Sequence, residues 1–92
     1  MDYEIKPELD VVLEKLKKRD KVAYLQIVKK IEEIVDTNPN HYKNLRYDLK
    51  EFKRVHIKNS FVLVFKYSKE KQLISFIDYD HHDIIYQKRY VI

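Results

Sequence analysis

The fold is decided by residues 54–65, RVHIKNSFVLVF, where polar and apolar side chains first alternate and then give way to a wholly apolar run. Residues 54–58 alternate with the period of two that is typical of a strand with one solvated face. Asn59 and Ser60 predict a turn. The run from 61 to 65 then indicates a central strand, either covered on both faces or capped by helices.

The residues before this stretch have the period of helices instead. Residues 2–6 predict a short strand ahead of Pro7, which suits the first turn of a helix because its missing N–H needs no partner there. Asp20 is a suitable N-cap for a second helix, which we expect to stop before Pro39. Apolar residues at helical spacing are Leu9, Val12, Leu13 and Leu16, and then Tyr24, Ile27, Val28, Ile31, Ile34 and Val35. These two helices should form a helical hairpin.

After the apolar run, a polar loop over residues 68–71 precedes a third strand from Leu73 to about Tyr79. The predicted order is a short strand, a helical hairpin and a three-stranded antiparallel meander (β-α-α-β-β-β). This order predicts an α+β domain with the helices on one sheet face. A chain of 92 residues should form it as a single domain over 1–92. The alternation places Arg54, His56 and Lys58 on the opposite face.

Composition excludes several classes of site. The chain has no glycine and no cysteine. A glycine-rich phosphate loop, a nucleophile elbow, a disulfide framework and a cysteine-based zinc site are therefore all absent. No apolar run approaches the roughly 18 residues of a membrane span, and the N-terminus does not resemble a signal peptide. We expect a soluble cytoplasmic protein without a cofactor.

The excess positive charge is concentrated in the middle of the chain. Residues 41–67 contain seven lysines and arginines and only two acidic residues, whereas the whole chain has a formal net charge of +4. Such a basic segment favours a polyanionic partner, because each phosphate that is neutralised releases counterions. The alternative is a solubilising lysine-rich face with no partner.

Histidines are the main candidates for chemistry. His56 lies between two apolar residues, so it should point to the polar face, where neighbouring positive charges would lower its pKa. His81 and His82 are adjacent and should face opposite ways if the strand continues, so at most one shares a face with His56. A metal site is not expected, because no His-Glu-x-x-His or His-x-His spacing occurs and any site would have to assemble through the fold. Tyr86 follows this cluster and could stack on a base of single-stranded RNA.

Three segments together resemble the RelE/ParE toxin superfamily of bacterial and archaeal toxin–antitoxin pairs. They are residues 44–57, NLRYDLKEFKRVHI, residues 61–65, FVLVF, and residues 80–86, DHHDIIY. The run from Val55 to Phe65 looks most like the YafQ branch, in which a histidine occupies the position of His56. The resemblance implies an mRNA interferase that enters the ribosomal A site of the 30S subunit and cleaves mRNA. It also implies silencing by a RelB-like antitoxin in a heterodimer or heterotetramer.

The resemblance also implies roles for individual residues. His82 matches the C-terminal catalytic position and would be the general acid, while Arg54 and His56 would orient the scissile phosphate and stabilise the transition state. Tyr86 matches the terminal aromatic residue that stacks on an mRNA base. The residues implied to hold the RNA backbone are Lys43, Arg46, Lys50, Lys53 and Lys58.

The chain departs from the family pattern at two positions. Val62 stands where RelE itself has a phosphate-binding arginine, and Ser60 stands where the YafQ branch has an aspartate proposed as the base. His56 is then the preferred base, with Asp83 as the second candidate. His41 could act as an auxiliary residue, since a family histidine aligns with Lys43.

Two other functions remain open at this level. One is a ParE-like module that binds and poisons DNA gyrase on the same fold. The other is an attenuated homologue that binds the ribosome or RNA without cutting, given the missing arginine.

Overall fold

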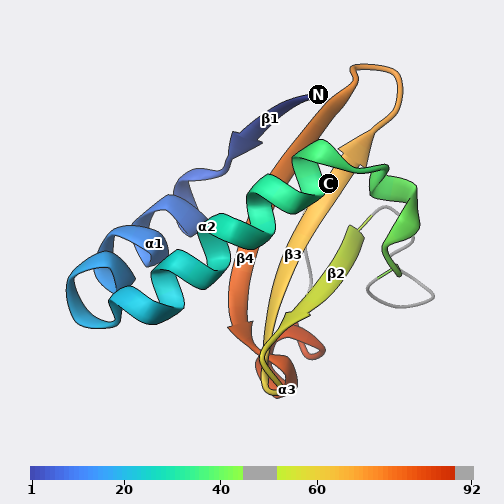
Figure 1. Cartoon of the computed structure of the whole chain (residues 1–92). Helices are drawn as coiled ribbons and strands as arrows, with labels where there is room; N and C mark the ends of the chain where they lie inside the picture. Colours follow the sequence, from blue (N-terminus) through green and yellow to red (C-terminus); the bar gives the residue numbers. More distant parts are fainter. Residues whose placement is uncertain (45–51, 89–92) are drawn as a thin grey trace.

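The computed structural model describes residues 1–44 and 52–88. Within them, the chain forms a four-stranded sheet, a helical hairpin and two short helical segments (Figure 1). The elements are β1 (Asp2–Ile5), α1 (Pro7–Arg19), α2 (Lys21–Asp36), the 3-10 helix η1 (Pro39–His41), β2 (Phe52–Ile57), β3 (Phe61–Ser68), β4 (Leu73–His81) and α3 (His82–Ile85). The predicted α+β order is therefore confirmed. None of the described helices is long and apolar enough to cross a membrane.

The strand order in the sheet is β1-β4-β3-β2. The meander β2-β3-β4 is antiparallel throughout, as predicted. β1 joins the free edge of β4 and runs parallel to it. This pairing ties the N-terminus to the last strand, so the helical hairpin forms the connection across the sheet.

The helical hairpin forms for local reasons that the sequence contains. Pro7 occupies the first turn of α1. Asp20 ends α1 and begins α2, where its side chain accepts a hydrogen bond from the N–H of Ala23 at 3.1 Å. Such a cap satisfies one of the amide groups that every helix start leaves without an intrahelical partner.

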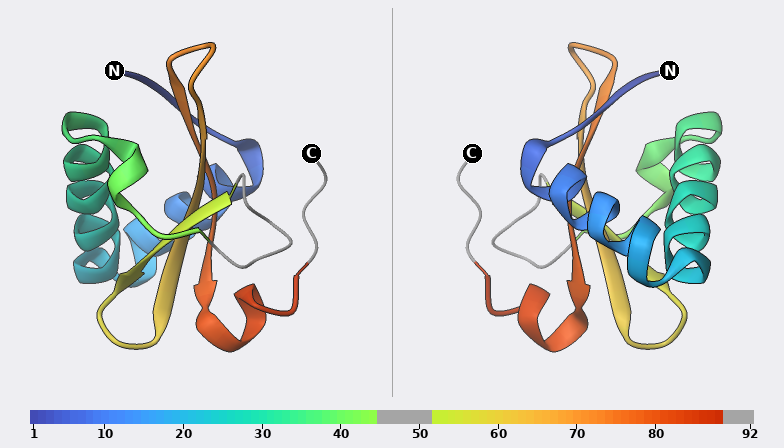
Figure 2. Two further views of the ribbon diagram at one scale, coloured as in Figure 1. Left: turned by 90° about the vertical axis from the view of Figure 1, so that its right-hand side faces the viewer. Right: turned by 90° about the vertical axis from the view of Figure 1, so that its left-hand side faces the viewer.

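One face of the sheet is covered by α1 and α2 (Figure 2). Leu63 and Phe65 of β3 point to this side, and both are fully buried there. Their partners from the rest of the chain are Leu9, Leu13, Ile27, Ile31, Ile34, Ile57, Ile74 and Phe76. This is the main core of the protein.

The reverse face has a second, smaller core. Val62 and Val64 of β3 point to this side and are buried against Phe52 and Ile85. Ile85 comes from α3, which lies on the side of the sheet away from the helical hairpin (Figure 2). Residues 62–65 of the apolar run are thus covered on both faces, because α3 supplies a cover that periodicity did not reveal, while Phe61 at the start of the run is exposed.

Two local expectations differ from the structure. β2 ends at Ile57, and Lys58 has a φ of 59°, so Lys58 belongs to the turn and does not continue the alternation with Arg54 and His56. Without glycine in the chain, a lysine takes this left-handed position at some cost in backbone energy. β4 also runs two residues past Tyr79, to His81.

Candidate active site

The reverse face of the sheet is organised in rows that cross the strands. His56 pairs with Val62, and Val62 pairs with Asp80. Arg54 pairs with Val64, and Val64 pairs with Asp78. Since directly paired residues share a sheet face, this face has a basic edge on β2, an apolar strip on β3 and an acidic edge on β4.

α3 is positioned over this face by its apolar and charged contacts. Ile85 packs on the apolar strip, and Tyr86 packs at the margin of the same cluster. Lys88 then reaches the acidic edge, with its Nζ 2.6 Å from Asp78 Oδ2 and 3.6 Å from Asp80 Oδ2. Burial by itself lowers the pKa of Lys88, but the hydrogen bond and charge of Asp78 and the charge of Asp80 outweigh it and raise the pKa. The ammonium group therefore offsets part of the negative charge of Asp78 and Asp80 next to the candidate site.

Arg54 faces Tyr86 and His56. Its guanidinium carbon lies 6.0 Å from the centre of the Tyr86 ring, at the limit of a cation–π contact. Its Nη1 lies 3.5 Å from Nδ1 of His56. Within residues 1–44 and 52–88, the buried Nε of Arg54 has no hydrogen-bond partner. Buried donors usually have a partner, so Arg54 keeps hydrogen-bonding capacity that the described residues do not use.

His56 is adapted to the neutral state. Its side chain stays exposed at the end of β2. Partial desolvation on the sheet, the Arg54 guanidinium and the nearby His82 together lower the pKa of His56. The predicted effect of neighbouring positive charge is confirmed in direction, with desolvation as the larger cause. An imidazole in this environment can accept a proton near neutral pH.

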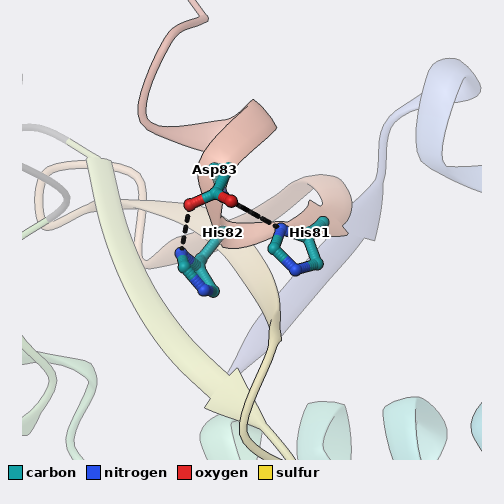
Figure 3. A group of neighbouring side chains, drawn as sticks. All are labelled: His81, His82 and Asp83. Atoms are coloured by element: carbon teal, nitrogen blue, oxygen red, sulfur yellow. Dashed lines mark hydrogen bonds and ion pairs between the residues drawn. The ribbon is translucent and has the colours of Figure 1, made fainter.

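His81, His82 and Asp83 form a compact cluster at the junction of β4 and α3 (Figure 3). The two imidazole rings are stacked, with centres 4.5 Å apart and planes 28° apart. The condition for their facing opposite ways is not met, because the strand ends at His81 and His82 already belongs to the helix. His81 caps α3, and its Nδ1 accepts a hydrogen bond from the N–H of Asp83 at 3.2 Å.

Asp83 contacts both rings through its carboxylate (Figure 3). Oδ1 lies 3.0 Å from Nδ1 of His82, and Oδ2 lies 3.7 Å from Nδ1 of His81. The closer contact fixes a proton on Nδ1 of His82 and orients the ring. The other ring nitrogen, Nε2, is then free of this carboxylate.

The structure therefore brings four of the predicted site residues into one neighbourhood: Arg54, His56, His82 and Tyr86. Tyr86 caps the end of α3, where its N–H donates to the His82 carbonyl at 3.0 Å, and its ring centre lies 6.4 Å from that of His82. Asp83 joins the group through His82. The sequence did not predict that His81 caps α3 or that Lys88 pairs with Asp78. No local pattern marks a histidine as a helix cap, or joins two charged residues that lie ten positions apart.

Other predicted residues lie elsewhere. Lys53 alternates with Arg54, and its ammonium group donates to the Tyr42 carbonyl at 3.1 Å and to Asn44 Oδ1 at 3.2 Å. His41 lies edge-on to Tyr42, whose own ring packs on Phe65 in the main core. Both are therefore on the helix side of the sheet.

Lys43 runs beside the start of β2, where its carbonyl accepts a hydrogen bond from the N–H of Arg54 at 3.0 Å. Lys58 lies in the turn between β2 and β3. Arg46 and Lys50 fall outside the described residues. A small pocket of about 160 Å³ between β1 and α2, lined by Tyr3 and Ile31 among others, contains none of the predicted site residues.

Comparison with known proteins gives the family. No family model matches the chain. The chain is 54% identical over 88 residues to a Methanocaldococcus jannaschii protein named "Putative toxin RelE4", which covers 96% of this chain and 93% of that protein. It is also 46% identical over 82 residues to an uncharacterized protein of Methanosarcina mazei, with 89% of this chain and 94% of the relative covered.

A solved structure agrees on the fold. The solution structure of the conserved hypothetical protein HP0892 from Helicobacter pylori matches with a TM-score of 0.57 and 22% sequence identity, covering 90% of this chain and 96% of that one. This match supports the arrangement of strands and helices. The family is shown by the 54% identity to the RelE4 protein over nearly the full length of both chains. The chain belongs to the RelE/ParE toxin superfamily, whose members are the toxin components of toxin–antitoxin systems.

Proposed function

We propose that this toxin is a ribosome-dependent endoribonuclease that cleaves mRNA in the A site of the 30S subunit and so inhibits translation in the cytoplasm. The observation that carries the proposal is the convergence of Arg54, His56, His82 and Tyr86 on one sheet face. Membership of the superfamily also supports it. The alternative, a module that only binds its target, would not need two histidines in different environments beside an arginine.

Cleavage of RNA without a metal ion places three demands on a site. A base must remove the proton of the ribose 2′-hydroxyl, a cation must stabilise the five-coordinate phosphorane, and an acid must protonate the departing 5′-oxygen. The products are a 2′,3′-cyclic phosphate and a free 5′-hydroxyl. The reverse face offers one residue for each demand.

His56 is the proposed base. Its lowered pKa keeps the imidazole neutral at neutral pH, which is the state that accepts a proton. It also stands next to Arg54, so a phosphate bound by the guanidinium would bring the adjoining 2′-hydroxyl within its reach. Asp83 is the weaker candidate, because its carboxylate is already engaged by Nδ1 of His82 at 3.0 Å.

Arg54 is the proposed phosphate ligand. Its Nε donor lacks a partner among the described residues, and a guanidinium binds phosphate oxygens through two parallel N–H groups. In the absence of the arginine that Val62 replaces, Arg54 would carry most of the stabilisation of negative charge in the transition state. Val62 itself is buried in the second core and serves packing.

His82 is the proposed general acid, and Tyr86 the proposed platform for a base. Asp83 orients the His82 ring through Nδ1, and in the imidazolium form of the ring the N–H at Nε2 can donate its proton to the leaving group. Tyr86 is held between Arg54 and His82, where its ring can stack on an unpaired nucleotide. Lys43 and Lys58 would add contacts to the RNA backbone, and so would Arg46 and Lys50, which lie outside the described residues.

The reverse face of the sheet, with its basic edge on β2, would be covered by a RelB-like antitoxin. An acidic or apolar segment of the antitoxin would pair with the basic edge of β2, in a heterodimer or a dimer of such pairs. Covering this face would inhibit the toxin directly, because RNA and antitoxin would compete for the same side chains.

The test is cleavage of ribosome-bound mRNA by His56→Ala and His82→Ala variants. Each is expected to lose at least about 100-fold in the rate of cleavage, as is usual for acid–base residues. His41→Ala is the matched control, because its ring lies beside Tyr42 on the helix side of the sheet. Full cleavage by both site variants would refute the proposal, and toxin-dependent gyrase–DNA breaks in place of RNA cuts would favour a ParE-like activity.

A further inference from the structure

We propose that His81, His82 and Asp83 form a binding site for a divalent transition-metal ion of the Zn²⁺ type, and that the bound ion inhibits the toxin. The inhibitory part rests on the proposed ribonuclease function, whereas the binding part does not. The sequence did not predict this site, because its histidines lack the usual ligand spacing. The fold assembles it where a strand passes directly into a helix.

The distances between the donor atoms suit a small cation. One donor atom from each residue can be chosen so that all three lie within 4.8 Å of one another. The two oxygen–nitrogen distances are 3.0 Å to His82 and 3.7 Å to His81. For bonds of about 2.1 Å at tetrahedral angles, neighbouring ligand atoms lie about 3.4 Å apart. The measured values fall on either side of that distance, so small side-chain rotations would complete the geometry.

The chemistry of the donors selects the kind of ion. Two imidazole nitrogens and one carboxylate oxygen suit Zn²⁺ and its neighbours in the transition series, whereas Mg²⁺ and Ca²⁺ prefer sites made of oxygen atoms. The cluster is also accessible, since the side chains of His81, His82 and Asp83 are 38%, 37% and 70% exposed. A three-ligand site of this exposure leaves a position for water.

Binding would change what each ligand does in the free protein. Nδ1 of His81 accepts the N–H of Asp83 and cannot hold that hydrogen bond and a metal ion at once. His82 would exchange its contact with the carboxylate for a bond to the ion. The ion and its remaining water would then occupy the space beside that ring, which RNA has to enter for cleavage. Occupancy should therefore inhibit cleavage without displacing Arg54 or His56.

Substitution of His81 separates metal binding from the rest of the site. His81→Asn keeps a side-chain oxygen that can cap α3, because asparagine is among the preferred N-cap residues, but it removes the imidazole. Asp83→Asn provides a second variant that keeps size and removes the charge of the carboxylate. His41→Ala is the control, since it removes a histidine outside the cluster.

The binding experiment is isothermal titration of the tag-free full chain with ZnCl₂, with MgCl₂ as a second titrant. Wild type and His41→Ala should bind one Zn²⁺ with equal affinity and should not bind Mg²⁺ measurably. His81→Asn and Asp83→Asn should each weaken Zn²⁺ binding by at least about 10- to 100-fold, the loss already typical when a hydrogen-bond partner of a metal ligand is removed, with unchanged circular dichroism. Absence of saturable Zn²⁺ binding by wild type, or equal binding by His81→Asn, would overturn the site.

The functional experiment is mRNA cleavage with and without Zn²⁺ at a concentration that saturates the wild type. Wild type should be inhibited at least about 10-fold and reactivated by a chelator, while His81→Asn should cleave at the same rate with and without the ion. Wild-type cleavage that is unchanged by bound Zn²⁺ would overturn the inhibitory role. If the metal-free toxin cuts no RNA at all, the proposed ribonuclease function fails while the titration still decides the metal site.

Discussion

Replacement of Ile85 tests whether the second core holds the candidate site together. Ile85 is fully buried between α3 and the sheet, against Phe52, Val62 and Val64. α3 has four residues, too few to be helical without support from the rest of the protein. Ile85→Ala should therefore weaken the attachment of the helix that carries His82 and leads to Tyr86.

The magnitude follows from what the substitution removes. Three buried carbon groups are lost, which is worth about 2.4 kcal/mol in transfer free energy. The cavity left behind brings the expected loss in the free energy of unfolding to about 2–5 kcal/mol. For a domain of this size, whose total stability is about 5–14 kcal/mol, that is a large fraction.

Urea denaturation measures the loss directly. With a slope of about 1–2 kcal/mol per molar urea, the midpoint of Ile85→Ala should fall by about 1–5 M. The neighbouring Ile84 is 47% exposed, so Ile84→Ala is a matched control that should change stability by no more than about 0.5 kcal/mol. Ile85→Val should fall between them, at about 0.5–1.5 kcal/mol.

Two further measurements follow the attachment of α3 itself. The Tyr86 amide, which donates to the His82 carbonyl, should exchange its hydrogen faster in Ile85→Ala than in wild type. Cleavage of ribosome-bound mRNA should decline in parallel. Equal urea midpoints and equal Tyr86 exchange for Ile85→Ala and Ile84→Ala would show that the second core does not position the site.

Three other predictions concern charged groups. The pKa of His56 is lowered in the folded protein, so the unfolded state binds more protons between that pKa and about 6.5. The free energy of unfolding should therefore rise with pH through this window and level off above it. His56→Gln should remove this rise, as measured by denaturation at a series of pH values. Lys88→Met should lower the free energy of unfolding by about 1–2 kcal/mol in urea denaturation, because the 2.6 Å ion pair involves a largely buried Asp78. A loss below about 0.3 kcal/mol would contradict this. Arg54→Gln should slow single-turnover cleavage by about 10²- to 10³-fold, with Arg54→Lys intermediate; identical rates for lysine and arginine would show that charge alone suffices at that position.

Local patterns predicted most of the fold. Pro7 and Asp20 marked the helix starts correctly, because a missing N–H and a side-chain cap act within one helical turn. The alternation in β2 placed Arg54 and His56 on the face away from the helices, because side chains on a strand project to alternate sides. The resemblance to the superfamily, read from the same segments, agreed with the near full-length similarity to the RelE4 protein.

By itself, then, the sequence determined the order of elements, the helical hairpin, the meander and the face on which Arg54 and His56 lie, since each depends on residues close together in the chain. Only the tertiary structure decided that β1 runs beside β4 and that α3 covers the reverse face. It also decided that His81, His82 and Asp83 converge, because the strand ends at His81 and the alternation expected beyond it stops. The first two outcomes depend on packing between distant segments, and the third depends on α3, which Ile85 anchors to the sheet; such packing leaves no periodic trace in the local sequence.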